Sequence, residues 1–203
     1  MPKIGVEKLF LAKYNNNNGV ISYSDGVVAA KMVKINININ AAGDNDFYAD
    51  NSIAESDSGF SGGTVTVTPD TLTQDASKLF LGLQSVTLTG TAAITGVTDE
   101  GAEELIYDDR MEPPFLGVGT IIMCKRNGAI AYRAVILLKN KFAVPPDAAE
   151  TKGSAINWQT DEVSGTIYRD DSEYHAWKKE ATFTTVEQAE AYVRNRLNMT
   201  TTP

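Results

Sequence analysis

The chain has 203 residues, 42% of them hydrophobic, which is enough for one ordinary core, so we expect a single domain over residues 1–203. Its 18 Lys and Arg are outnumbered by 26 Asp and Glu, for a formal net charge of -8. This charge balance disfavours a protein that binds nucleic acid stably, because such proteins contact the phosphates with many Lys and Arg side chains.

The N-terminal region predicts a hairpin. The segment Gly5–Tyr14 is rich in apolar residues, Asn15–Gly19 interrupts it, and Val20–Tyr23 is apolar again. Asn and Gly tolerate left-handed backbone, so two strands joined by a four- or five-residue loop are expected. Asp25-Gly26 indicates a second turn.

Strict alternation in Lys31–Asn40, with Ile and Asn on opposite faces, predicts a strand with one buried face. The stretch Asn51–Gly63 is rich in Ser, Asp, Glu and Gly, and Thr64–Thr68 alternates again. We therefore expect a long flexible loop over about residues 51–63 between two strands.

A short helix is predicted after Thr68-Pro69-Asp70, because Thr can cap free amides and Pro fits the first helical position. Apolar residues follow at helical spacing as far as Gly82. The next segment, Gln84–Val97, is rich in Thr and Gly, which favours strand or loop over helix.

The strongest hairpin signal is Leu116–Leu138, where two β-rich runs flank Arg126-Asn127-Gly128. This sheet is expected to continue to Phe142 and to end before Pro145-Pro146. Further strands are predicted at three segments, Ala155–Trp158, Val163–Arg169 and Glu173–Phe183.

The end of the chain predicts an amphipathic helix over about residues 186–198. Thr185 and Gln188 fit a capping box. Val186, Ala189, Val193 and Leu197 then form one apolar stripe.

Catalytic and metal-binding patterns are weak. Ser61 lies in Gly59–Gly63, which resembles the glycine-flanked serine of trypsin-like proteases, but Phe60 replaces the Asp that precedes that serine, and the one histidine, His175, lies far downstream. The pairs Asp108-Asp109 and Asp170-Asp171 lack the ligand spacing of a calcium loop. We therefore expect no enzyme and no catalytic, cofactor-binding or metal-binding residue. A hydrolase that uses Ser61 remains a weaker alternative.

Two further observations limit the function. No glycine-rich loop leads into a helix with the spacing that cradles phosphates. Most of the aromatic residues are expected in the core, but an exposed aromatic row on a sandwich would bind sugars, so a carbohydrate-binding β-sandwich module, as in an adhesin or a receptor-binding domain, is the alternative function.

Cysteine content and hydropathy bear on location. The one cysteine, Cys124, lies in an apolar run where a thiol packs as a small hydrophobe, and it excludes a disulfide framework. No signal-like segment occurs, and no stretch approaches the roughly 18 apolar residues that cross a bilayer. We expect no membrane partner and folding in a cytoplasm.

Several segments, in their order along the chain, resemble the major tail proteins of siphophages and of related prophages of Gram-positive bacteria. The resemblance rests on Lys3–Ala12, Phe47–Asn51 with Ala54-Glu55, Pro114–Gly117, Asn127-Gly128, Tyr132-Arg133, Lys139–Phe142, Thr151–Gly153, Trp158–Thr160 and Ser164–Thr166.

This resemblance implies a mainly β, sandwich- or barrel-like tail tube fold with a short flanking helix. It implies a structural virion protein whose homo-hexameric rings stack into the tail tube. The implied partners are tape-measure, tail terminator and initiator proteins, with genomic DNA as transient, non-specific cargo. The place of action would be the virion tail, assembled in the bacterial cytoplasm. We expect the loop at 51–63 and the C-terminal helix to become ordered on contact with a neighbouring ring.

Overall fold

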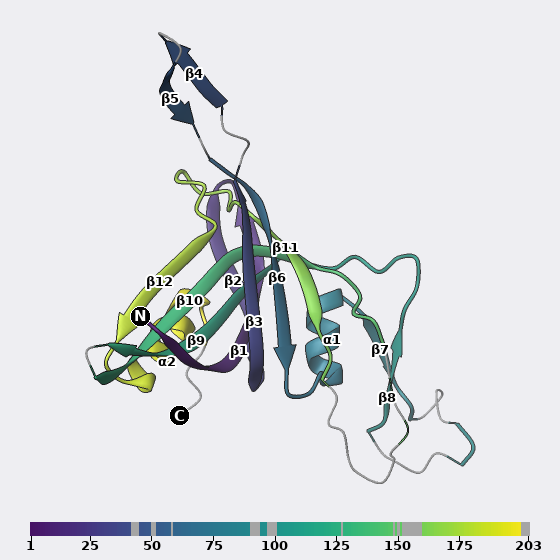
Figure 1. Cartoon of the computed structure of the whole chain (residues 1–203). Helices are drawn as coiled ribbons and strands as arrows, with labels where there is room; N and C mark the ends of the chain where they lie inside the picture. Colours follow the sequence, from purple (N-terminus) through teal and green to yellow (C-terminus); the bar gives the residue numbers. More distant parts are fainter. Residues whose placement is uncertain are drawn as a thin grey trace.

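A computed structural model describes residues 1–41, 45–49, 52–57, 59–89, 94–96, 101–126, 128–147, 149, 151 and 160–199 (Figure 1). Its strands are β1 (Lys3–Asn17), β2 (Val20–Ala30), β3 (Met32–Ala41), β4 (Asn45–Ala49), β5 (Ser52–Asp57), β6 (Phe60–Pro69), β7 (Gln84–Thr87), β8 (Glu103–Ile106), β9 (Leu116–Arg126), β10 (Ala129–Phe142), β11 (Val163–Tyr168) and β12 (Lys178–Phe183). Its helices are α1 (Gln74–Leu81) and α2 (Val186–Arg196). The expected mainly β class with two helices is confirmed.

One antiparallel sheet of eight strands forms most of the fold. Its order is β2-β1-β9-β10-β11-β6-β3, and β12 also pairs with β10. The two outermost strands, β2 and β3, are separated in the chain by Lys31 alone. The sheet therefore curls until its two ends approach each other at this residue.

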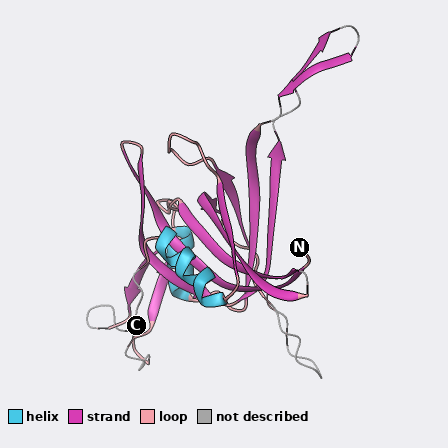
Figure 2. Cartoon of the chain, turned by 90° about the vertical axis from the view of Figure 1, so that its left-hand side faces the viewer, coloured by secondary structure: helices cyan, strands magenta, loops and turns pink. Residues whose placement is uncertain are grey.

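Both faces of the central strands β1, β9 and β10 are buried. On one face, Leu9, Leu116 and Leu137 pack with Leu79 and Phe80 of α1. On the opposite face lie Phe10, Ala12, Ile121, Ala134, Ile136, Ala189, Val193 and Leu197, the last three from α2 and its C-cap. In Figure 2, a helix lies across the strands on this side.

The N-terminal hairpin is confirmed, but its turn is shorter than expected. Asn17 pairs with Val20, and Asn18 and Gly19 form a two-residue turn with φ values of 52° and 85°. Positive φ at both positions suits the primed turn that matches strand twist. Asp25-Gly26 is not a second turn: the two residues lie together opposite Ala12, as a bulge within β2.

The predicted loop over 51–63 is wrong where the chain is described. Ser52–Asp57 pairs with Asn45–Ala49 as the β4–β5 hairpin, and Phe60–Gly63 belongs to β6. In Figure 1 this hairpin extends beyond the ends of β3 and β6. A ribbon away from the core needs no buried face, so its sequence need not alternate.

Helix α1 begins later than expected. Pro69 is the last residue of β6 and pairs with Met32, at a strand end where a missing N–H is tolerated. The N-cap is Thr73, whose Oγ1 accepts a hydrogen bond from the amide of Ala76 at 3.2 Å. The expected end at Gly82 is confirmed, with φ at 67°.

The β9–β10 hairpin and the end of its sheet at Phe142 are confirmed, with the turn residue Asn127 outside the described residues. The expected strand Ala155–Trp158 also lies outside them. Within Gln84–Val97, only Gln84–Thr87 is a strand in the described ranges, paired with β8.

The strand expected over Glu173–Phe183 begins only at Lys178. Before it, the amide of Asp170 donates to the carbonyl oxygen of Ala176, and His175 has a φ of 49°. A residue in left-handed backbone breaks an extended strand.

Helix α2 is confirmed, and it ends two residues earlier than expected. Thr185 is its N-cap and accepts from the amide of Gln188 at 3.3 Å. Ala189, Val193 and Leu197 are fully buried on the chain's own sheet, so the helix packs within the single chain, and its expected contact with a neighbouring ring stays a prediction.

Candidate assembly surfaces

Three strands of the sheet, β2, β3 and β12, have a strand beside them on one side only in the described part of the chain. Strand β2 pairs only with β1, and β3 pairs only with β6. Exposed apolar side chains lie on both strands: Val27 and Val28 are each 42% exposed, Val33 is 56% exposed and Ile39 is 40% exposed. Unpaired edges with apolar side chains invite pairing with another strand.

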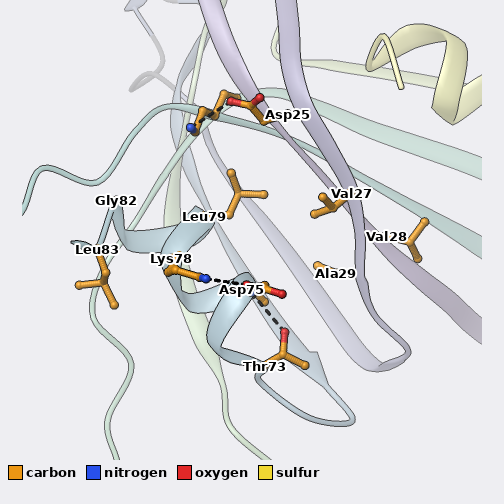
Figure 3. Close-up of a pocket in the computed structure, with 12 residues that line it drawn as sticks. Asp25, Val27, Val28, Ala29, Thr73, Asp75, Lys78, Leu79, Gly82 and Leu83 are labelled. Carbon is orange, nitrogen blue, oxygen red and sulfur yellow. Dashed lines mark hydrogen bonds and ion pairs between the residues drawn. The ribbon is translucent and has the colours of Figure 1, made fainter. Parts of the chain in front are cut away.

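A groove of about 730 Å³ runs beside the β2 edge (Figure 3). The strand contributes Val27 and Ala29, whose side chains point toward α1 in the figure. The helix side contributes Leu79, and Leu83 follows the helix. An apolar floor beside free backbone groups suits an extended peptide that adds a strand to the sheet.

The charged side chains of this groove are paired with one another. Lys78 Nζ lies 2.7 Å from Asp75 Oδ1 and 2.7 Å from Glu103 Oε2. These two hydrogen-bonded carboxylates raise the pKa of Lys78 above its ordinary value. At the other end, Lys13 Nζ lies 3.0 Å from Asp25 Oδ2. With its charges neutralised in pairs, the groove favours a backbone and apolar side chains over a charged ligand.

Ser61 and His175 have separate partners. Ser61 Oγ donates to the carbonyl oxygen of Asn40 at 3.1 Å, within the β3–β6 pair. His175 Nδ1 lies 3.3 Å from the carbonyl oxygen of Asp170, in the segment before β12. A serine nucleophile needs a base within hydrogen-bonding reach. Ser61 and His175 hydrogen-bond to different backbone carbonyls and not to each other.

The acidic pairs form ion pairs and turn hydrogen bonds. Asp108 holds Arg110, with 2.6 Å between Oδ2 and Nη2. Asp170 is buried, and its Oδ1 accepts from the Ser172 hydroxyl at 2.7 Å. Across the described ranges, no group of three His, Cys, Asp or Glu side chains is placed to hold a metal ion.

Asp171 joins three elements. Its carboxylate accepts from Lys139 Nζ and from Tyr14 Oη, each at 2.8 Å. These hydrogen bonds hold the pKa of Asp171 below its ordinary value. Burial, together with the adjoining carboxylate, raises the pKa of Tyr14 to about 12. The cluster ties the end of β1 to β10 and to the segment after β11, a structural role that the sequence pattern did not reveal.

A sugar-binding platform requires neighbouring exposed rings. Among the residues whose exposure is described, the most exposed aromatic side chains are Tyr174 (86%), Tyr107 (57%) and Tyr168 (40%). Of these, Tyr168 packs edge-on against the half-buried Phe115. None of the five ring pairs among the described residues joins two exposed rings.

The edge residues Val27 and Val28 were missed by sequence reasoning, because Asp25-Gly26 indicates a turn that would end the strand before them. A scan of protein-family models and a search of curated proteins find no match to this chain. No helix in the described ranges is long and apolar enough to cross a membrane.

Proposed function

We propose that this chain is a structural virion protein of the siphophage major tail protein kind. Each copy has a sandwich- or barrel-like tail tube fold. Copies form hexameric rings by pairing strand edges, and the rings stack into a β-lined tail tube. Tape-measure, terminator and initiator proteins are its assembly partners, and genomic DNA passes through the tube as non-specific cargo. The protein has no catalytic role.

The observation that carries this proposal is the pair of unpaired edges, β2 and β3, at the two ends of one curled sheet. Two different edges on one molecule make a heterologous contact, in which the β2 edge of one copy meets the β3 edge of the next. Such contacts close into a ring when the rotation between copies allows it. The net charge of -8 agrees with a conduit that does not retain DNA.

The β2 edge is tested by Val28→Lys. Lysine on an edge strand opposes further pairing, and the exposed position tolerates it in the monomer. We expect the variant to lose rings and tubes in negative-stain electron microscopy while keeping the wild-type circular dichroism spectrum. Val86→Lys is the matched control, because Val86 lies in β7, outside the main sheet, and is 37% exposed.

Tubes of normal width from Val28→Lys would remove the β2 edge from the ring contact. The carbohydrate-binding alternative predicts a different result, saturable binding on a glycan array with no assembly, and it would replace the proposal if found.

A further inference from the structure

The tip of the β9–β10 hairpin combines cations with apolar side chains. Strand pairing brings the start of β1 to this tip, since Lys3 pairs with Cys124 of β9, and Ile130 of β10 pairs with Lys125. The resulting tip cluster is Lys3, Ile4, Lys125, Arg126 and Ile130. All five side chains are exposed, Ile4 and Ile130 each by 51%.

The three cations of the tip cluster, Lys3, Lys125 and Arg126, form no ion pair with any acid in the described ranges. Three basic residues at one end are unusual for this chain, because its other 15 Lys and Arg are outnumbered by its 26 Asp and Glu. A basic tip with two exposed isoleucines suits an acidic surface that also has an apolar hollow.

The chain itself has such a surface. A pocket of about 350 Å³ follows the end of β10, and its lining includes Leu72, Tyr107, Val144, Pro145, Asp147 and Asp161. Tyr107 is 57% exposed and Val144 is 50% exposed, so the apolar wall faces solvent. Asp147 and Asp161 form no ion pair within the described part of the chain. We call this the acidic pocket.

The tip cluster and the acidic pocket lie at opposite ends of one strand. Ile130 is the second residue of β10, and Val144 lies two residues beyond its end. At about 3.3 Å per residue, roughly 45 Å of chain separates them. Because β10 is paired along its length with β9, β11 and β12, it cannot fold back to bring the two together. The two surfaces can meet only between molecules.

We infer that the tip cluster of one copy docks into the acidic pocket of a second copy. Ile130 enters the apolar hollow, and Lys125 and Arg126 face Asp147 and Asp161. The contact is heterologous and propagates from copy to copy. This contact adds detail to the proposed function. It rests on that function only because it takes a second copy of the chain as the partner.

Charge reversal on each surface tests the contact. Arg126→Glu and Asp147→Lys are each expected to weaken self-association roughly tenfold in sedimentation velocity. The controls are Lys179→Glu and Glu173→Lys, which change the charge equally at exposed residues outside both surfaces and leave association at the wild-type level. Wild-type association should be strong in about 0.01 M salt and weak in about 1 M salt, because the Debye length falls from about 30 Å to about 3 Å.

Mixing the two variants separates lost complementarity from misfolding. Arg126→Glu reverses one charge of the tip and Asp147→Lys reverses one charge of the pocket, so position 126 of the first variant and position 147 of the second again carry opposite charges when the two chains meet. The remaining tip and pocket are unchanged, and an equimolar mixture should therefore recover wild-type association. A mixture no stronger than either variant alone would overturn the inference. So would a wild-type chain that stays monomeric in low salt at its highest concentration.

A cross-link locates the contact independently of affinity. With Ile130→Cys and Val144→Cys in one chain, a short bismaleimide should give a ladder of multimers, whereas Ile130→Cys alone should give none. Cys124 is 1% exposed, so the wild-type chain treated in the same way should give no ladder. Hollow tubes from Arg126→Glu with wild-type yield would refute this contact and leave the proposed function standing. Cross-linked chains without rings would support the contact and contradict the proposed function.

Discussion

Gly119 of β9 lies directly against Val193 of α2: a β-carbon on residue 119 would overlap Cγ1 of Val193. The same carbon would lie 3.2 Å from Leu197 Cδ1 and 3.3 Å from Phe10 Cβ. Val193 and Leu197 are fully buried. The C-terminal helix therefore docks on β9 only because residue 119 has no side chain.

Replacing this glycine should loosen the helix. Gly119→Ala is expected to lower the free energy of unfolding by about 1–3 kcal/mol, because an added carbon in a filled core forces its neighbours to move. Urea denaturation followed by circular dichroism measures it. Gly59→Ala is the control, since the nearest atom to its new carbon, Arg169 Nη2, is 3.7 Å away. Equal stabilities for the two variants would show that α2 adjusts freely.

The Asp171 cluster should make stability depend on acid. The pKa of the Asp171 carboxyl is lower in the folded chain than the ordinary 3.8, because Lys139 and Tyr14 donate hydrogen bonds to it. A group with a depressed folded pKa stabilises above its unfolded pKa, and this contribution is lost as the pH falls through the folded value. Asp171→Asn should thus lower the melting temperature at neutral pH, and the curves of the variant and the wild type should converge once the pH falls below the folded pKa of Asp171.

Thermal melts of both chains from acid to neutral pH provide the measurement. Glu173→Gln, at an exposed residue with no ion pair among the described residues, is the control and should follow the wild type at every pH. A constant difference between Asp171→Asn and the wild type would contradict the role of the charge.

Tyr14 should act at the alkaline end. Burial raises its pKa to about 12, so the folded chain keeps the phenol proton that an unfolded chain loses near pH 10. Stability therefore falls as the pH rises from about 10 toward 12. In a titration followed by phenolate absorbance, the wild type should show an absorbance step near pH 12 that Tyr14→Phe lacks. If the step that the variant lacks is centred at about pH 10, the burial of this ring is contradicted.

The β4–β5 hairpin offers a test that spares the core. Its two strands pair only with each other in the described chain, and Figure 1 shows them beyond the end of the sheet. Replacing residues 45–57 with a short Gly-Ser turn should leave the melting temperature of the monomer within about 2 °C of wild type. If the hairpin joins rings, tube growth is lost and single rings remain in electron micrographs. Tubes of normal length would assign it no part in stacking.

Local signals in the sequence predicted several elements. The strand from the alternation in β3 is confirmed, with Ile35 and Ile37 packed against the core and Ile39 40% exposed. The apolar stripe of α2 is confirmed as a buried face, and the β9–β10 hairpin is confirmed with both of its faces buried. The turn predicted at Asp25-Gly26 and the helix start predicted at Thr68-Pro69 were wrong. The same residue types occur in turns, bulges and strand ends, and only the pairing with β1 and β3 decides among these structures.

The candidate surfaces were harder to predict. The free edges depend on which strands become neighbours, and β2 and β3 are at opposite ends of the sheet although they are consecutive in sequence. The groove beside β2 requires α1 to pack next to an edge that is distant in the chain. Neither relationship has a local sequence signal, so the sequence predicted the strands without their exposed edges.

The most direct test of the proposed function is negative-stain electron microscopy of the concentrated wild-type protein, with its mass measured in solution by light scattering. The account predicts hollow rings or tubes of uniform width, with masses that are multiples of six chains. Single chains at every concentration and salt, or solid fibres without a lumen, would contradict it.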